Sequence, residues 1–396
     1  MGRPADRPGT PLVAPPKRPA ERERTPSPPA IRDDAMPLRR PTPAEAREFW
    51  TLFIVLLPFY LWLLPREGPP QMVGFGLVAA VIGYIVWRSP HRRPEPAARR
   101  SLLEAVAMLA WSMAVIWGIL PWGPVGKVVG NVLIGLTVAY ILFFARRLRG
   151  DSWEAWGLGS PWAFLAHLRH GEGRHRTWLA LALANLALLT LCGWAGEVVQ
   201  EIVRKAIRKA IGFRGELHLS FPARVLLVVP PMNFFFACFR YDNARQAARL
   251  LSWYFLGGLV LVVAGGYLYI YRLHGGWVEL RPLQGLTGVG GYALWGTLQE
   301  LLFLSYFNTR IRQGLTSPYL SALLTAVVFS LYHLTAYTLM AICFFVMIVW
   351  ALIFQAAPNL FLLGIVHGIS GGFGTALSIE GMPPIKIKAS VGPFNR

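Results

Sequence analysis

Three polar side chains lie in the middle of long apolar runs in the C-terminal part of the chain. Glu300 falls within the run 292–307, and His333 and His367 fall within two later apolar segments. A charged side chain at the centre of a membrane helix costs about 2.5–3.5 kcal/mol on insertion scales, so such residues persist mainly where they face a polar interior. The other six histidines lie in loops or polar flanks: His91, His167, His170, His175, His218 and His274. We therefore predict that Glu300, His333 and His367 form one site.

These residue types allow more than one kind of chemistry. Glu300 lies in apolar surroundings without an arginine one turn away, and could serve as a general base that takes a proton from water. Two histidines and a glutamate also make a catalytic zinc site with one open position, although no His-Glu-x-x-His helix is present. A lone glutamate or histidine in a membrane helix can instead simply hydrogen-bond two helices together. No cofactor is expected, and zinc is kept as the minor alternative.

The composition of the chain indicates which kind of secondary structure positions these residues. The chain has 396 residues, of which 54% are hydrophobic and 15% are charged. Its apolar runs of about 17–23 residues are long enough to cross a bilayer as helices. The fold class is therefore predicted as an all-α polytopic transmembrane helical bundle with about eleven spans. The predicted spans are 49–64, 72–87, 102–122, 125–145, 178–196, 221–239, 250–271, 292–308, 318–340, 341–357 and 359–379.

The chain divides into three parts by composition. Residues 1–46 are rich in Pro and Arg and are expected to be a disordered tail. Residues 47–176 hold N-terminal transmembrane helices and basic loops, and residues 177–396 form a C-terminal membrane domain. The Lys and Arg excess of 1–46, 88–100 and 146–176 places these segments, and the N-terminus, in the cytoplasm. Residues 197–211 are predicted as an amphipathic interfacial helix, which the span count puts on the opposite side.

Charge and cysteine content exclude two further classes of function. The net charge of +19 is spread over loops between apolar runs, so it fits helix orientation and contact with anionic membrane lipid rather than nucleic-acid binding. Arg310 and Arg312 are expected to anchor the cytoplasmic end of their helix at the membrane interface, with contact to the terminal carboxylate of a substrate as the alternative. The three cysteines, Cys192, Cys238 and Cys343, lie within apolar runs. They are therefore interpreted as small core residues and not as a disulfide framework or a thiolate metal site.

Around the three polar residues, the spacing of neighbouring residues resembles a known family. The CAAX-protease and bacteriocin-processing (CPBP) intramembrane endopeptidases have a Glu-Glu-x-x-x-Arg, a Phe-x-x-x-His and a His-x-x-x-Asn motif on successive helices. The three motifs occur here as Gln299-Glu300 with Leu304, as Phe329 with His333, and as His367 with Gly371. The likeness covers residues of about 285–375, and the N-terminal spans take no part in it.

This resemblance implies an intramembrane endopeptidase that cleaves a peptide bond in a membrane-associated peptide or protein tail. It implies Glu300, His333 and His367 as catalytic residues in a metal-free mechanism, with Gln299 and Phe329 contacting the substrate. A multi-pass protein of the bacterial inner membrane is expected. Prenylated substrates are not implied.

Three substitutions separate the chain from the family pattern. Gln299 cannot take a proton as a general base, Leu304 removes an arginine that could pair with a carboxylate, and Gly371 removes an oxyanion donor. Two alternatives therefore stand. Either Glu300 replaces the missing carboxylate in an active protease, or the site is inactive and the protein binds a substrate or a partner helix.

Overall fold

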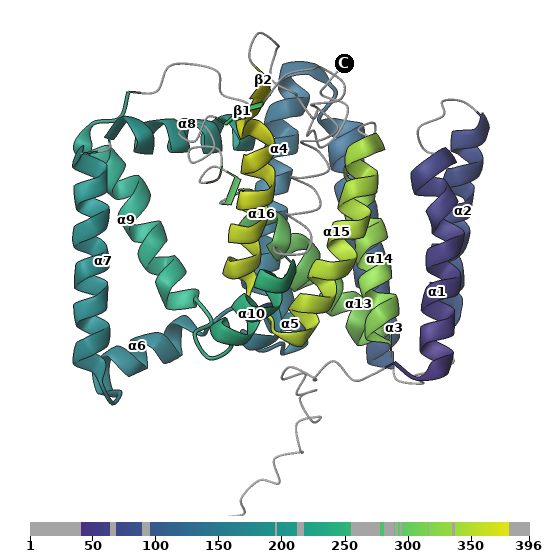
Figure 1. The fold of residues 1–396 in the computed structure, drawn as a ribbon, viewed down its shortest axis with the longest axis horizontal. Helices are drawn as coiled ribbons and strands as arrows, with labels where there is room; N and C mark the ends of the chain where they lie inside the picture. Colours follow the sequence, from purple (N-terminus) through teal and green to yellow (C-terminus); the bar gives the residue numbers. More distant parts are fainter. Residues whose placement is uncertain are drawn as a thin grey trace, which may run out of the picture. The chain divides into compact units, whose positions relative to one another are not determined.

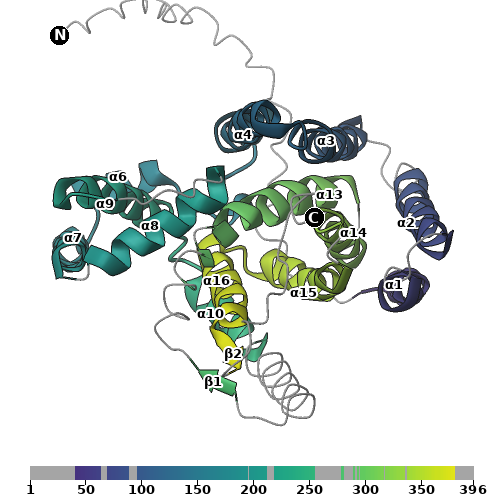
Figure 2. The same ribbon diagram turned by 90° about the horizontal axis from the view of Figure 1, so that it is seen from above.

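The computed structural model describes most of the chain as helices (Figures 1 and 2). The described residues are 41–63, 69–88, 96–194, 196–211, 218–254, 278–280, 289, 292–293, 295–315, 317–334 and 337–379. The first half comprises α1 (Pro43–Pro58), η1 (Phe59–Leu63), α2 (Pro69–Arg88), α3 (Pro96–Met113), η3 (Ala114–Ile119), α4 (Gly123–Ala139), η4 (Tyr140–Ala145), α5 (Arg146–Arg149), η5 (Glu154–Trp156), α6 (Pro161–His170) and α7 (Arg174–Trp194).

The second half contains the predicted site. It comprises α8 (Gly196–Ile211), α9 (Phe221–Cys238), α10 (Ala244–Tyr254), the helical residues 295–300, η7 (Leu301–Asn308), α13 (Thr309–Gly314), α14 (Pro318–Leu331), α15 (Tyr337–Ala356) and α16 (Leu360–Ala376). One short antiparallel strand pair, β1 (Val278–Leu280) with β2 (Leu377–Ile379), matches Glu279 with Ser378.

The polytopic helical class predicted from the sequence is confirmed, and the protein is an integral membrane protein. Within the described ranges, seven helices are long and apolar enough to cross a bilayer, and two shorter apolar helices are Pro318–Leu331 and Leu360–Gly371. The predicted span 250–271 falls largely on residues 255–277, outside the described residues. The count of eleven spans therefore stays a prediction, as does the division at residues 176 and 177.

α1 begins at Pro43, inside the segment 1–46 that was expected to be disordered. Thr42 caps this helix, because its hydroxyl accepts a hydrogen bond from Glu45 N at 3.3 Å while Glu45 Oε2 accepts one from Thr42 N at 3.0 Å. This reciprocal pair satisfies main-chain donors that the first turn of a helix leaves open. Proline at the first helical position adds a favourable backbone angle. Residues 1–40 lie outside the described residues.

The buried core lies around α14. Figure 2 shows α13 to α16 between the helices α1 to α4 and the helices α6 to α9. α14 packs against α15, η7, α13 and α1, and nearly all of its residues are buried. In the most apolar 18-residue stretch of α7 only 6% of the residues are buried, whereas in that of α15 the share is 56%. Because α7 is apolar and yet exposed, it faces lipid, and the C-terminal helices form the interior.

The expectation that Arg310 reaches the membrane interface is wrong. Its side chain is entirely buried, with Nε donating to Glu104 Oε1 at 3.0 Å and Nη1 donating to Asp151 Oδ2 at 2.6 Å. Its Nη2 also donates to the carbonyl oxygen of Ala145 at 2.7 Å. Arg310 thus connects α13 to α3 and to the end of η4 inside the protein.

The first turns of α3 and the short helix α5 lie together. Arg149 of α5 forms an ion pair with Glu104 near the start of α3, at 2.8 Å. The shared side predicted for 88–100 and 146–176 stays a prediction, because residues 89–95, with Arg93, lie outside the described residues. α8 is helical over Gly196–Ile211. It lies at one end of α7, and α6 lies at the other end (Figure 1). Which end faces the cytoplasm stays a prediction.

The interpretation of the cysteines as small core residues agrees with the structure. Cys192, Cys238 and Cys343 are all buried, and each is free. Their burial follows from the apolar runs in which they lie.

Candidate active site

Glu300 lies where the helical residues 295–300 pass into the π-helical segment η7. π-helical turns are rare and occur frequently at functional sites, because they turn the side chains that follow out of the α-helical pattern. The side chain of Glu300 is fully buried, whereas its neighbour Gln299 is half-buried. Glu300, and not the residue at the family's first glutamate position, therefore points into the protein.

The helix α16 positions His367 by means of its capping residue. Asn359 precedes α16, and its Oδ1 accepts a hydrogen bond from Leu362 N at 3.2 Å. Its Nδ2 donates to the carbonyl oxygen of Arg240 at 2.9 Å. The next backbone amide, Leu360 N, donates to the carbonyl oxygen of Gly157 at 2.9 Å. These bonds fix the start of α16 against two preceding loops.

Small residues allow α16 to approach the helix that carries Glu300. A Cβ atom added at Gly368 would lie 2.5 Å from Ala293 Cα, and one added at Gly296 would lie 2.8 Å from His367 Cβ. One added at Gly364 would meet Thr297 in the same way. Glycines at this spacing let two membrane helices pack backbone against backbone. This close approach brings His367 within reach of Glu300.

Glu300 and His367 form a direct pair. His367 Nδ1 and Glu300 Oε1 are 2.6 Å apart, and the side chain of His367 is 15% exposed. With the carboxylate ionised, the Nδ1–H group donates to it, and such charge-assisted bonds are among the strong ones in proteins. Among the described residues no group hydrogen-bonds to the second carboxylate oxygen, Oε2, which is buried. One oxygen of Glu300 is thus held by histidine, and the other is directed at no described protein group.

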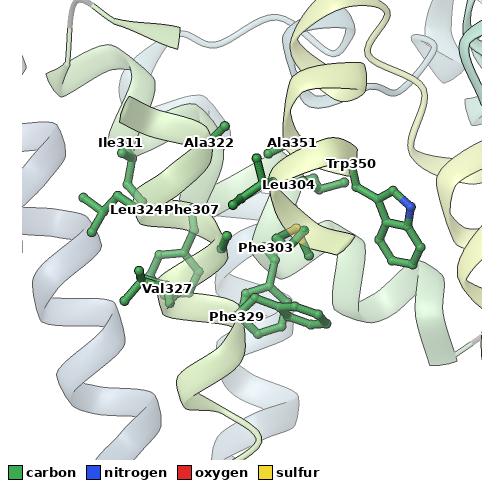
Figure 3. Packing of buried hydrophobic residues seen from close by; sticks show 14 of the residues in the cluster. Phe303, Leu304, Phe307, Ile311, Ala322, Leu324, Val327, Phe329, Trp350 and Ala351 are labelled. Atoms are coloured by element: carbon green, nitrogen blue, oxygen red, sulfur yellow. The ribbon is translucent and has the colours of Figure 1, made fainter. Parts of the chain in front are cut away.

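Aromatic rings surround this pair. Phe329 contacts His333 edge-on at 5.1 Å between ring centroids, and it contacts His367 at 6.4 Å. On another side, the Trp350 ring lies 5.1 Å from the His367 ring. Figure 3 shows Phe329 beside Phe303 in the apolar cluster. The structure therefore pairs Glu300 with His367 and places His333, which is buried just after α14, against the ring of Phe329.

The positions that depart from the family pattern have apolar or small surroundings. Leu304 is fully buried and lies in the apolar cluster of Figure 3, where an arginine would be a buried charge. Gly371 is packed against Tyr292, because a Cβ at residue 371 would lie 2.6 Å from Tyr292 Cδ1. The space for a side chain at residue 371 is therefore already occupied by a tyrosine ring.

We expect Gly371→Asn to lower the thermal stability of the protein instead of restoring a family feature. The added Cβ would overlap Tyr292, and overpacking of this kind costs about 1–3 kcal/mol. The melting temperature in detergent measures the effect. Gly135→Asn is the matched control, since nothing lies within 4 Å of a Cβ at that position in α4. Equal melting temperatures for the two variants, or no recovery on adding Tyr292→Ala, would contradict the packing argument.

The zinc alternative finds only part of its ligand set. Within the described ranges, no three side chains of His, Cys, Asp or Glu gather as a metal ion requires. Glu300 and His367 supply two of the three ligands that a catalytic zinc site of this type uses. Metal dependence therefore stays a matter for experiment.

Trp350 is a site residue that the sequence did not indicate. It lies in the apolar run of α15, and nothing in its spacing separates it from the other aromatic residues of that run. Only the packing of α15 against α16 places its ring on His367.

Comparison with known proteins supports the likeness seen in the motifs. Residues 283–372 match the family described as type II CAAX prenyl endopeptidase Rce1-like. No curated protein and no solved structure matches the chain. The matched segment contains Glu300, His333 and His367 together with the helices that pack around them. Residues 283–372 are thus similar to the Rce1-like endopeptidases, in agreement with the resemblance that the motifs showed.

Proposed function

We propose that this protein is an intramembrane endopeptidase that cleaves a peptide bond in a membrane-associated peptide or protein tail. The observation that carries the proposal is the pair of His367 with the fully buried Glu300, in which Oε1 is held at 2.6 Å and Oε2 meets no described hydrogen-bonding group. A carboxylate with one oxygen fixed and the other able to bind water is suited to general-base catalysis. The family match of residues 283–372 supports the reaction class.

In the proposed mechanism, Glu300 Oε2 binds a water molecule and takes its proton as the water oxygen attacks the carbonyl carbon of the substrate. His367 holds the carboxylate in place through its hydrogen bond to Oε1 during proton transfer. The proton then passes from Glu300 to the leaving nitrogen as the C–N bond breaks, so the carboxylate is regenerated. His333 and His367 are the two candidates for the residue that supports the base and its water. The contact between His367 and Glu300 favours His367 for that supporting role. His333, which lies against the same Phe329 ring, is proposed to contact the substrate carbonyl.

The surroundings of the pair suit an apolar substrate. Phe329 and Trp350 border His367, and both are buried. A low-dielectric environment strengthens the electrostatic interactions that stabilise charge in the transition state. Gln299, half-buried beside Glu300, is proposed to hydrogen-bond the peptide backbone, and Phe329 is proposed to contact its side chains.

The test is a comparison of the wild type with Glu300→Gln. Each is reconstituted in liposomes with a mixture of membrane peptides, prenylated and unprenylated, and new peptide ends are identified by mass spectrometry. The wild type is expected to generate products that Glu300→Gln does not, because glutamine cannot accept the proton. Glu197→Gln, at an exposed position of α8, is the matched control and should behave as the wild type. Identical products from Glu300→Gln would reject the proposal. Inhibition of the wild type by a chelator would favour the zinc alternative.

A binding function without catalysis is the second candidate. It is favoured by the tyrosine ring that fills the space beside Gly371 and by the burial of Leu304, because both changes remove polar groups of the family motifs. The same liposome experiment separates the two functions. A binding protein would yield no products from either variant, while photo-crosslinking would show that both retain the same peptide.

A further inference from the structure

Tyr254, at the end of α10, lies next to the Glu300–His367 pair. α10 packs against α15 and α16. The Tyr254 ring is 6.1 Å from the Trp350 ring, measured between centroids, and the Trp350 ring is 5.1 Å from the His367 ring. A single aromatic ring therefore separates Tyr254 from His367.

The hydroxyl group of Tyr254 is directed at the same region. Ser370 of α16 and Glu300 both lie in the surroundings of this hydroxyl group. Ser370 follows His367 by three residues in α16, so the two lie on neighbouring positions of one helix face. Tyr254 is thus placed beside the turns of α16 that carry His367 and Ser370.

The sequence of α10 turns Tyr254 inward. Ala247 and Leu251 are buried, and Tyr254 follows them at the next helical repeat of three residues. Residues at this spacing share one face of a helix. The intervening Arg249, Ser252 and Trp253 are exposed. Tyr254 therefore belongs to the packed face of α10, where its side chain is half-buried.

The position of α10 relative to α16 is fixed by hydrogen bonds at their first residues. Asn243 Nδ2 donates to the carbonyl oxygen of Pro358 at 2.6 Å, and Asn359 Nδ2 donates to Asn243 Oδ1 at 3.2 Å. Arg240 is held by Asp242 and donates to the carbonyl oxygen of Glu154 at 2.6 Å. Because the two helices start from one hydrogen-bonded loop pair, Tyr254 and His367 are held in a constant relation.

We propose that Tyr254 is a further catalytic residue whose hydroxyl donates a hydrogen bond to the carbonyl oxygen of the scissile bond. The bond strengthens as that oxygen gains negative charge, and no proton leaves the tyrosine. A neutral phenol can donate in this way without a counter-charge. The assignment rests on the proposed endopeptidase function, and it supplies a donor on the side of α16 where Gly371 offers no side chain.

The test uses a peptide that the wild type cleaves and Glu300→Gln does not. The absence of any such peptide would reject the proposed function itself, whatever Tyr254 does. With it, Tyr254→Phe is expected to lower kcat by about 10²–10³-fold, as loss of one oxyanion donor does elsewhere, with KM changed by less than about twofold. The corresponding peptide trifluoromethyl ketone forms a hydrate that resembles the tetrahedral intermediate. Its Kd is expected to rise by at least about tenfold in Tyr254→Phe.

Tyr241→Phe is the matched control, since Tyr241 is exposed and its hydroxyl donates to the carbonyl oxygen of Phe236. It should leave kcat, KM and the Kd of the ketone unchanged. An unchanged kcat in Tyr254→Phe would overturn the proposal, and so would a raised KM with constant kcat. A fall in kcat that comes with a lower melting temperature and an unchanged Kd of the ketone would assign Tyr254 a structural role only. That result would also overturn the proposal.

Discussion

Combining Glu300→Gln with His367→Ala is expected to slow peptide cleavage no further than either substitution alone. Each single change should lower the single-turnover rate by about 10²–10⁴-fold, the usual contribution of a general acid or base. The effects should not multiply, because His367 acts through the same carboxylate: its Nδ1 lies 2.6 Å from Glu300 Oε1. Residues that act as one unit show this non-additivity in mutant kinetics.

The controls for this pair are chosen by exposure. His170→Ala changes an exposed histidine of α6 and should leave the rate unchanged. Glu300→Gln keeps the shape of the side chain and a group that can hydrogen-bond His367, so its melting temperature should stay near that of the wild type. Rates that fall by the product of the two single effects would show that Glu300 and His367 act independently, and would reject the paired mechanism.

Arg310→Met is expected to destabilise the protein by about 3–5 kcal/mol, the usual effect of removing one partner from a buried ion pair. The change would leave Asp151, whose side chain is 5% exposed, without its ionic partner. Glu104 would keep Arg149 at 2.8 Å. The loss is therefore expected to come mainly from Asp151. Denaturant unfolding in detergent, followed by tryptophan fluorescence, measures it.

The double variant Arg310→Met with Asp151→Asn should recover part of the lost stability, because asparagine removes the orphaned charge. Gln313 Nε2 donates to Asp151 Oδ1 at 2.7 Å and Trp156 Nε1 donates to Asp151 Oδ2 at 3.1 Å, and the single amide oxygen of asparagine would still accept from one of these two donors. Arg245→Met, at an exposed position of α10, is the matched control. An Arg310→Met variant as stable as this control would contradict the role of the buried network.

The sequence by itself determined the class of the protein and the residues of interest. Apolar runs of bilayer length have few alternatives to membrane helices, because the backbone must satisfy its own hydrogen bonds in lipid. Glu300, His333 and His367 were recognisable for the same reason, since polar side chains in such runs are costly wherever the helices pack. The motif spacing also indicated a resemblance to the CPBP endopeptidases, and residues 283–372 match an Rce1-like family model.

Only the tertiary structure decided which of these residues meet. Glu300 and His367 are 67 residues apart in sequence, and their contact depends on glycines that let two helices touch along their backbones. Periodicity identifies the face of a helix but not its neighbour, so the pairing of Glu300 with His367 and the approach of Tyr254 and Trp350 could not be predicted.

Arg310 illustrates the same limit for charge. The position of Arg310 beside an apolar run suggested an anchor at the membrane interface. Its partners Glu104 and Asp151, however, lie 206 and 159 residues away in sequence. A charge becomes favourable inside a membrane protein only when folding brings its counter-charges to it. The sequence gives the charges, and the packing of α13 against α3 decides whether they face the interface or one another.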